Sequence, residues 1–110
     1  MCRVLVVEDD PDQLEIRATL LANVGHEVVR AATTADALRR FRDCDLVVMD
    51  LLPGVDDLIA ELPDAVRVIV LSGRDSVSER IAVRASEILR KPCPSRTLMA
   101  AVSKWTSPSR

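Results

Sequence analysis

DLVVMDLLPGVD, residues 45–56, is the stretch from which the fold of this chain can be worked out. Leu46–Met49 is an apolar run of strand length, and Asp50 follows it directly. A run without polar alternation is typical of a strand covered on both faces, as in a parallel sheet between helices. We therefore expect a buried strand here, with an acidic residue at its carboxyl end.

Other strand-length runs repeat along the chain, and segments of helical period separate them. The runs are Val4–Val7, a shorter one around Val28–Val29, Val66–Leu71 and a weak one at Glu87–Leu89. The helical segments are expected from Pro11 to a stop at Gly25, over about Thr34–Phe41, Asp56–Leu62 and Ser76–Ala85, and over the stretch that carries Leu98, Ala101, Val102 and Trp105. This alternation predicts an α/β fold: a doubly wound five-stranded parallel sheet with helices on both faces. The third and fourth helices are expected to be short.

Local signals mark where the first two helices begin. Asp10 before Pro11 is typical of an N-cap followed by proline in the first turn, and Gly25 is a natural stop. Either Thr33 or Thr34 can cap the second helix.

Length and charge limit the classes of protein to which the chain can belong. Its 110 residues suit one domain over residues 1–110, with a tail at about 106–110 that we expect to be frayed. The net charge is −2 and no segment concentrates basic residues, which argues against nucleic-acid binding. No apolar run approaches the ~18 residues that cross a bilayer, so no membrane contact is expected.

The cysteines favour a reducing compartment. Cys2, Cys44 and Cys93 are odd in number and far apart, which fits neither a disulfide framework nor a zinc site. We therefore expect three ordinary thiols and a cytoplasmic protein. His26 is the only histidine and is expected at the surface.

Polar residues stand at the ends of the predicted strands. The first, third, fourth and fifth strands lead, in that order, into Glu8-Asp9-Asp10, Asp50, Ser72 and Lys91-Pro92. In a parallel sheet these ends meet at one edge, where open α/β sheets bind ligands. Taken singly, each has an ordinary explanation: an aspartate after a strand is more often a cap or turn residue, and Glu8-Asp9 fits a solvated loop as well as a metal site. Gathered together, the carboxylates call for a hard divalent cation such as Mg²⁺.

Lys91 adds an independent indication. The chain uses arginine for almost all of its positive charge, and Lys91 is one of only two lysines. A compact ammonium at a strand end suits a point contact with a phosphate or a carboxylate.

Four segments in order resemble the receiver domain of bacterial two-component response regulators, of the chemotaxis-regulator type. They are VLVVEDD at 4–10, DLVVMDLLPGVD at 45–56, VIVLSGRD at 68–75 and EILRKPCP at 87–94, and the likeness runs from about Arg3 to Trp105. The resemblance implies a flavodoxin-like fold with strand order 2-1-3-4-5. It also implies a phosphorelay phosphoprotein that is phosphorylated by a sensor histidine kinase or a phosphotransfer protein. Such a domain is no enzyme beyond its self-phosphorylation and autophosphatase chemistry.

The resemblance assigns the acceptor and the metal ligands. Asp50 matches the phosphoacceptor, which becomes an aspartyl phosphate. The matching Mg²⁺ site consists of Asp9, Asp50 and the backbone carbonyl of Leu52, with Glu8 bound through water.

The resemblance also assigns the response to phosphorylation. Ser72 matches the switch hydroxyl, Lys91 the lysine that contacts the phosphoryl group, and Lys91-Pro92 a cis peptide bond. Ile88 stands at the position of a switch aromatic, and the chain has no tyrosine. The implied output surface is the face of the fourth helix, fifth strand and fifth helix, around Arg84, Ile88, Arg90 and Lys104.

Several features depart from the family pattern. Two residues separate Asp50 from Pro53, one fewer than usual, and Asp57 stands where glycine is common. The connections from Asp50 to Ser72 and from Ser72 to Lys91 are also shortened. These departures favour an alternative function, a degenerate receiver that acts as a phosphorylation-independent interaction module. A third reading, a Mg²⁺-dependent phosphatase or phosphomutase, requires a DxD nucleophile motif on the first strand, which Glu8-Asp9-Asp10 does not provide.

Overall fold

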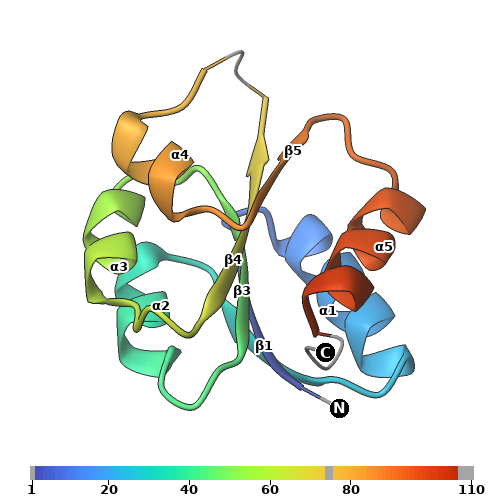
Figure 1. Ribbon diagram of the computed structural model, residues 1–110. Helices are drawn as coiled ribbons and strands as arrows, with labels where there is room; N and C mark the ends of the chain where they lie inside the picture. The colour runs from blue at the N-terminus through green and yellow to red at the C-terminus, as the bar shows by residue number, and fades with distance from the viewer. Residues whose placement is uncertain (1, 74–75, 107–110) are drawn as a thin grey trace.

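The computed structural model describes residues 2–73 and 76–106, and its strands form one parallel sheet. The strands are β1 (Arg3–Val7), β2 (Glu27–Ala31), β3 (Leu46–Asp50), β4 (Arg67–Ser72) and β5 (Glu87–Arg90). The helices are α1 (Pro11–Asn23), α2 (Thr34–Arg40), α3 (Val55–Glu61), α4 (Glu79–Arg84) and α5 (Ser95–Thr106). The sheet order is β2-β1-β3-β4-β5, so the predicted α/β fold and its strand order are confirmed (Figure 1).

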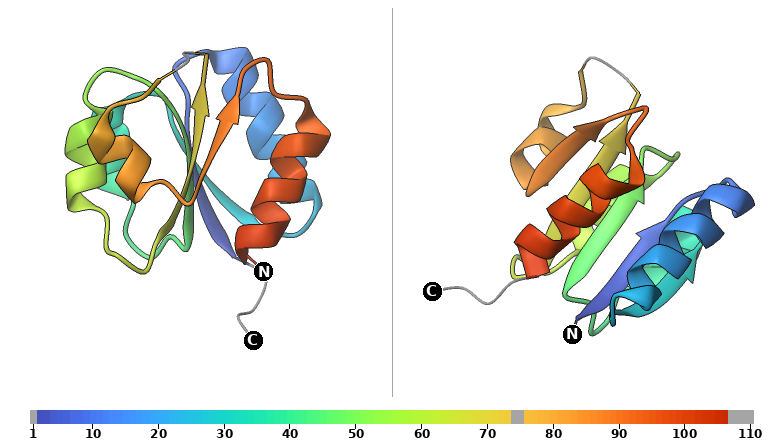
Figure 2. Two further views of the ribbon diagram at one scale, coloured as in Figure 1. Left: turned by 45° about the horizontal axis from the view of Figure 1, so that its top comes forward. Right: turned by 90° about the vertical axis from the view of Figure 1, so that its right-hand side faces the viewer.

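Helices cover both faces of the sheet. α1 and α5 pack on one face, and α2, α3 and α4 pack on the other (Figures 1 and 2). Along β3, Val47 and Met49 belong to the core beneath α2–α4, whereas Leu46 and Val48 belong to the core beneath α1 and α5. Successive side chains of a strand point to opposite faces, so a strand covered on both sides needs apolar residues at every position. The unbroken run at Leu46–Met49 follows from this double burial.

Polar residues cap the first two helices. Asp10 caps α1, and its carboxylate accepts a hydrogen bond from the Asp12 N–H at 2.9 Å. Thr33, rather than Thr34, caps α2, and its hydroxyl oxygen accepts a hydrogen bond from the Asp36 N–H at 3.0 Å. Each cap satisfies N–H groups that the first helical turn leaves without an intrahelical partner.

The third and fourth helices are short, as predicted, but α4 is shorter than the expected Ser76–Ala85. It begins at Glu79, and residues 76–78 are not helical. Ser78 is its N-cap: the backbone there is extended, and the Ser78 Oγ accepts a hydrogen bond from the Ile81 N–H at 3.3 Å. Serine hydroxyls compete for nearby backbone groups and favour a helix start over a helix interior, which is the physical reason for the difference.

The chain is helical up to Thr106, whose hydroxyl donates a hydrogen bond to the Val102 carbonyl at 2.7 Å. The rest of the tail for which fraying is predicted, residues 107–110, lies outside the described residues. Among the helices described, none has the length and apolar character needed to cross a membrane.

The register of the sheet brings the polar strand ends to one edge. β1 and β3 pair in parallel, and Glu8 follows β1 at the level at which Asp50 ends β3. β4 flanks β3 on the other side, and its last residue, Ser72, lies one position beyond Leu71, the partner of Asp50. Lys91 follows β5, which pairs in parallel with β4. The polar residues predicted at the strand ends are therefore neighbours in space.

Candidate functional site

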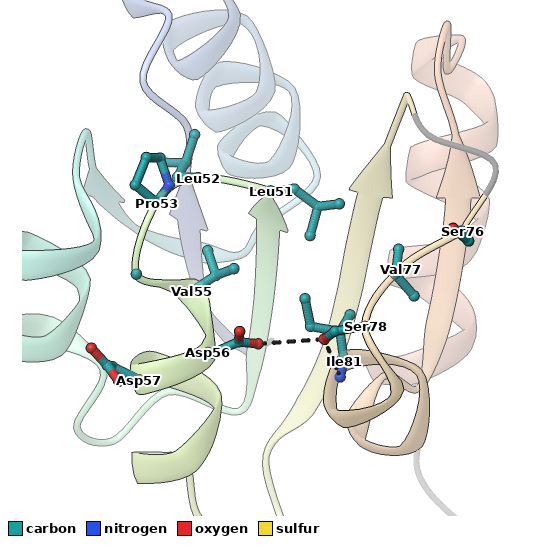
Figure 3. A pocket seen from close by; sticks show the side chains of 11 residues that line it. Leu51, Leu52, Pro53, Val55, Asp56, Asp57, Ser76, Val77, Ser78 and Ile81 are labelled. Carbon is teal, nitrogen blue, oxygen red and sulfur yellow. Dashed lines mark hydrogen bonds between the residues drawn. The ribbon is translucent and has the colours of Figure 1, made fainter.

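Two cavities flank the carboxyl end of β3. The smaller, of about 440 Å³, lies between the turn after β3 and the start of α4, and it is lined by residues 51–57, 76–78 and Ile81 (Figure 3). The larger, of about 740 Å³, is lined by Glu8, Asp9, Asp10, Gln13, Arg17, Asp50, Lys91, Pro92 and Cys93. Most of the polar strand ends identified from the sequence gather in the larger cavity.

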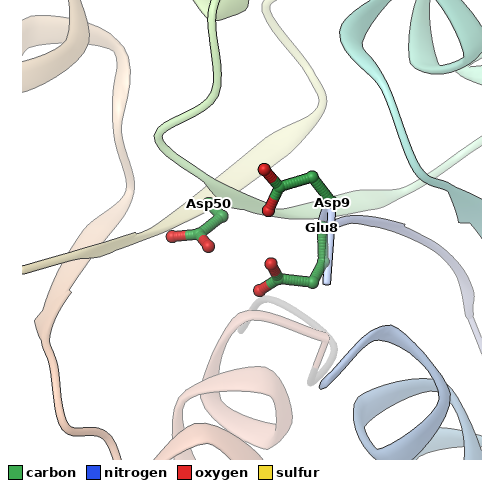
Figure 4. Close-up of side chains that lie close together, drawn as sticks. All are labelled: Glu8, Asp9 and Asp50. Atoms are coloured by element: carbon green, nitrogen blue, oxygen red, sulfur yellow. The ribbon is translucent and has the colours of Figure 1, made fainter. Parts of the chain in front are cut away.

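Three carboxylates meet in the larger cavity. An oxygen from each of Glu8, Asp9 and Asp50 lies within 4.8 Å of an oxygen from the other two. Figure 4 shows Glu8 and Asp9 extending from the end of β1 toward Asp50 at the end of β3. Like charges at this separation repel one another, so the cluster requires cations or protons close to it.

Asp50 is buried, and one of its carboxylate oxygens has two partners. The Lys91 ammonium lies 2.5 Å from Asp50 Oδ1, and the Leu51 backbone N–H donates a hydrogen bond to the same oxygen at 3.2 Å. The Lys91 side chain is 36% exposed and the Asp50 side chain 10% exposed, so the ammonium approaches the carboxylate from the more open part of the site. Lys91 thus provides one of the cations that the carboxylate cluster requires.

Glu8 is the most deeply buried of the three carboxylates, and both of its oxygens have partners. Oε1 contacts Nη1 of Arg17 in α1, and Oε2 accepts a hydrogen bond from the Asp10 backbone N–H at 3.1 Å. Burial raises the pKa of the Glu8 carboxyl and the neighbouring Asp50 adds to the rise, whereas the Asp10 N–H and Arg17 oppose it. The contacts with the Asp10 N–H and with Arg17 therefore stabilise the ionised form of Glu8 at a position where burial favours the neutral form.

The carboxylate cluster fits a hard divalent cation. Glu8, Asp9 and Asp50 all offer oxygen ligands, and their mutual distances allow one ion to interact with the three together. Asp10 also lines the cavity, but its carboxylate caps α1. The residues present therefore suit Mg²⁺, which prefers oxygen ligands.

Ser72 lies beside this cluster, although it is not among the residues that line the larger cavity. It is the buried last residue of β4, and its carbonyl accepts a hydrogen bond from the Lys91 backbone N–H at 2.9 Å. The peptide bond between Lys91 and Pro92 is cis. Lys91 is therefore joined to the end of β4 through its backbone and to Asp50 through its side chain.

The chain turns tightly after Asp50. The Leu52 N–H donates a hydrogen bond to the Asp50 carbonyl at 3.0 Å, and the Leu52 carbonyl accepts one from the Val55 N–H at 3.2 Å. Pro53 and Gly54 form the middle of that second turn, and Gly54 is left-handed with φ 88° and ψ 2°. These angles match the third position of a type II turn, where glycine is favoured and proline commonly precedes it.

Leu51 and Leu52 line the smaller cavity, and neither lines the larger one (Figure 3). Because the Leu52 carbonyl already accepts the Val55 N–H, a metal ion would have to share this oxygen with that hydrogen bond. The role of the Leu52 carbonyl as a metal ligand stays a prediction.

Arg17 is the charged residue of this site that sequence reasoning does not identify. It lies three residues after Leu14, on the stripe that Ala18 and Leu21 continue, and its side chain is only 12% exposed. A charged residue on the inward stripe of a helix is the signal that marks it, because such a side chain needs a buried partner. The spacing within the helix cannot show that this partner is Glu8.

The face formed by α4, β5 and α5 carries the four residues that the resemblance assigns to the output surface. Ile88 and Arg90 are exposed on β5. Arg84 donates hydrogen bonds to two carbonyls of the segment between α3 and β4, at 2.7 and 2.8 Å. The Lys104 ammonium lies 3.8 Å from the Glu87 carboxylate. Ile88, Arg90 and Lys104 are therefore exposed on this face, whereas Arg84 is half-buried.

Residues 4–103 match the family model of the response regulator receiver domain. Protein PilH of Pseudomonas aeruginosa is 28% identical over 116 residues, which cover 94% of this chain and 96% of PilH. The transcriptional regulatory protein PrrA of Mycobacterium tuberculosis is 38% identical over 111 residues, which cover 91% of this chain and 48% of PrrA. The chain is thus similar to nearly the whole of one relative and spans about half the length of the other.

Solved structures with similar sequences have the same fold. The non-phosphorylated HemR receiver domain of Leptospira biflexa is 26% identical with a TM-score of 0.84, covering 100% of this chain and 98% of that one. The response regulator protein TrrA of Thermotoga maritima, solved in complex with Mg(2+)-BeF, is 29% identical with a TM-score of 0.81, covering 96% and 99%.

The turn after Asp50 is expected to depend on glycine at position 54. Gly54→Ala should lower the free energy of unfolding by about 2 kcal/mol, because a left-handed residue with a Cβ is strained and that Cβ would lie 3.3 Å from Thr34 Cγ2. Gly25→Ala is the control: φ is 98° but nothing lies within 4 Å of its Cβ, so backbone strain alone predicts about 1 kcal/mol. Urea denaturation measures both losses, and equal values would contradict a steric role for Thr34.

Proposed function

This chain belongs to the response regulator receiver domain family of two-component signalling, and on that basis we propose that it accepts a phosphoryl group on Asp50. The donor is a sensor histidine kinase or a phosphotransfer protein, and the product is an aspartyl phosphate. The family is one of signalling proteins rather than classical enzymes, so the chemistry of this domain is limited to its own phosphorylation and dephosphorylation.

The position of Lys91 against Asp50 is the observation that carries this proposal. The Lys91 ammonium lies 2.5 Å from the buried Asp50 carboxylate, and two further acids lie beside it. This arrangement is suited to a reaction that brings more negative charge to Asp50. Lys91 and the Leu51 N–H both bind Oδ1, so we assign the attack on phosphorus to Oδ2. The new Oδ2–P bond forms as the donor's P–N bond breaks, and the donor's imidazole keeps that electron pair. Lys91 then neutralises charge on the phosphoryl oxygens.

The carboxylate cluster would hold the Mg²⁺ ion on which the proposed transfer depends. Asp9 and Asp50 would be its direct side-chain ligands, and Glu8 would bind it through water. When bound there, Mg²⁺ neutralises negative charge on the phosphoryl oxygens and orients them for in-line attack. The complex of TrrA with Mg(2+)-BeF supports the same class of ligand in this chain.

Ser72 and Lys91 convert phosphorylation into a change at the protein surface. Both residues gain contacts that exist only with the phosphoryl group, and such differential contacts shift a two-state equilibrium. The hydrogen bond from the Lys91 N–H to the Ser72 carbonyl, at 2.9 Å, links the end of β4 to the end of β5. Because Ile88 is aliphatic, the response uses backbone movement of β4 and β5 in place of an aromatic rotation. An output protein binds the face of α4, β5 and α5.

The alternative function is a degenerate receiver that binds its partner without phosphorylation. The short turn after Asp50 favours it, since the Leu52 carbonyl is bound to the Val55 N–H and Leu52 lines the smaller cavity. Mg²⁺ needs near-octahedral coordination at about 2.0–2.1 Å and tolerates little error in ligand position. A site with one ligand fewer would bind the metal weakly and accept phosphate slowly.

Asp50 is expected to be the site of labelling by acetyl phosphate and Mg²⁺. The wild-type protein should gain one acid-labile, hydroxylamine-sensitive phosphoryl group, and Asp50→Asn should lose it because an amide is no nucleophile for phosphorus. Asp45→Asn is the matched control, since Asp45 precedes the same strand at its opposite end and is exposed. Intact mass spectrometry measures the label, and equal labelling of Asp50→Asn would show that another residue is the acceptor. Asp9→Asn should label weakly, and higher Mg²⁺ should restore part of the loss.

Ser72→Ala and Lys91→Ala should separate acceptance from signalling. Both variants should still bind beryllofluoride with Mg²⁺, but the amide shifts on the face of α4, β5 and α5 should shrink, because each loses a contact that distinguishes the two states. Ser95→Ala, at an exposed serine that begins α5, is the control and should respond like the wild type. If Ser72→Ala shows the wild-type shift pattern in NMR spectra, Ser72 is not the switch residue.

Lengthening the turn after Asp50 tests the degenerate-receiver alternative. One alanine inserted between Leu51 and Leu52 should tighten Mg²⁺ binding and speed labelling by acetyl phosphate. The carbonyl two residues after Asp50 would then belong to the inserted alanine, outside the turn that the Leu52 carbonyl closes with Val55, and could reach the metal. The same insertion between Pro63 and Asp64, in the connection to β4, is the control. Calorimetric titration with Mg²⁺ and the labelling rate provide the two measurements. Weaker binding together with slower labelling would mean that the short turn is already competent, and the alternative would lose its support.

A further inference from the structure

Arg17 is a largely buried cation inside the acidic site. It extends from the side of α1 on which Leu14, Ala18 and Leu21 lie, and Leu14 and Leu21 pack in the core beneath α1 and α5. The Arg17 side chain is 12% exposed and that of its partner Glu8 is 3% exposed. Removing both ions from water costs free energy, so this pair is weak evidence for a purely stabilising role.

The contact with Arg17 occupies a carboxylate that the proposed metal site needs. Arg17 Nη1 contacts Glu8 Oε1, while the Asp10 N–H binds Oε2 at 3.1 Å. Any water that joins Glu8 to a metal ion must therefore share Glu8 with a guanidinium already in place. Arg17 also lines the same cavity as Asp9 and Asp50.

Arg17 changes the charge that an entering cation meets. When all three acids of the cluster are ionised, they carry three negative charges against the two positive ones of Lys91 and Arg17, which leaves one net negative charge. Without Arg17 the same set would have two. Charges interact more strongly at the reduced dielectric of a partly buried site than in water, so one additional cation weakens the binding of another.

We propose that Arg17 is a resident counter-ion that lowers the Mg²⁺ affinity of this site and sets the metal concentration at which Asp50 can be phosphorylated. The inference rests on the proposed function, because it takes the carboxylates as the Mg²⁺ site. In the metal-free protein, Arg17 offsets the repulsion among the carboxylates and holds Glu8 in position. A metal ion that enters competes with the guanidinium for Glu8 and is repelled by its charge.

Mg²⁺ titration of Arg17 variants tests this role directly. Arg17→Met removes the charge and keeps a shorter unbranched side chain, whereas Arg17→Lys keeps the charge. Arg30→Met is the matched control: Arg30 pairs with Glu15 of α1 at 3.1 Å, but both side chains are exposed and neither lines the larger cavity. The readout is the Kd for Mg²⁺ alone, measured by calorimetry at constant ionic strength, with thermal unfolding to establish that each variant folds.

Arg17→Met should lower the Kd for Mg²⁺ about tenfold, equivalent to about 1.4 kcal/mol. Arg17→Lys should stay close to the wild-type Kd, and Arg30→Met should match the wild type. An unchanged or higher Kd in folded Arg17→Met overturns the inference, since it would make Arg17 a structural residue or a support for the metal ligands. If Arg17→Met does not fold, Arg17→Gln carries the same prediction, because its amide removes the charge and can still donate a hydrogen bond to Glu8.

Labelling of Asp50 distinguishes failure of this inference from failure of the proposed function. If acetyl phosphate labels Asp50 in the wild type while removal of the Arg17 charge leaves the Kd for Mg²⁺ unchanged, only the role of Arg17 is wrong. If neither the wild type nor any Arg17 variant binds Mg²⁺ or is labelled on Asp50, the role of Arg17 and the proposed function are both wrong. A third outcome supports the role of Arg17 and the proposed function together: labelling reaches half its maximal rate at lower Mg²⁺ in Arg17→Met than in the wild type.

Discussion

Repulsion among three carboxylates is the constraint around which this end of the molecule is arranged. The parallel register of β1 and β3 brings Glu8, Asp9 and Asp50 together, with oxygens within 4.8 Å of one another. Two cations from other parts of the chain oppose the repulsion: Lys91, which follows β5, and Arg17, in the middle of α1. The site is thus assembled from residues widely separated in sequence, and its negative charge is only partly neutralised. That remaining charge is what suits it to a divalent cation.

The turn after Asp50 determines how much of the backbone can join this site. The Leu52 carbonyl closes the turn with Val55, and the Thr34 hydroxyl donates a hydrogen bond to the Pro53 carbonyl at 2.8 Å. α2 therefore holds the turn from one side, and the left-handed Gly54 lies against Thr34. A turn restrained by hydrogen bonds within itself and to α2 has little freedom to redirect a carbonyl. The turn whose Leu52 carbonyl the family resemblance assigns as a metal ligand lines the smaller cavity.

A continuous path of contacts connects the site with the face of α4, β5 and α5. Lys91 bonds to the end of β4 through its N–H, and β5 precedes it directly. At the other end of β5, Glu87 accepts a hydrogen bond from Trp105 Nε1 at 2.8 Å, which joins the strand to the end of α5. A change at Lys91 can therefore reach α5 through β5. The path contains an aliphatic Ile88, so the response that we propose would depend on packing and backbone position.

The sequence by itself determined the alternating elements and the residues that end each strand. A strand buried on both faces requires an unbroken apolar run, so the strands could be located from the sequence. The carboxyl ends of parallel strands lie at one edge of the sheet, so the residues that follow these runs could be expected to meet. The strand order 2-1-3-4-5 came from the family resemblance. Only the tertiary structure decided that Arg17 pairs with Glu8, that the Leu52 carbonyl bonds to Val55, and that α4 begins after Ser78. A long side chain or a turn carbonyl takes whichever partner the packing of other elements brings within reach, and no local periodicity records that choice.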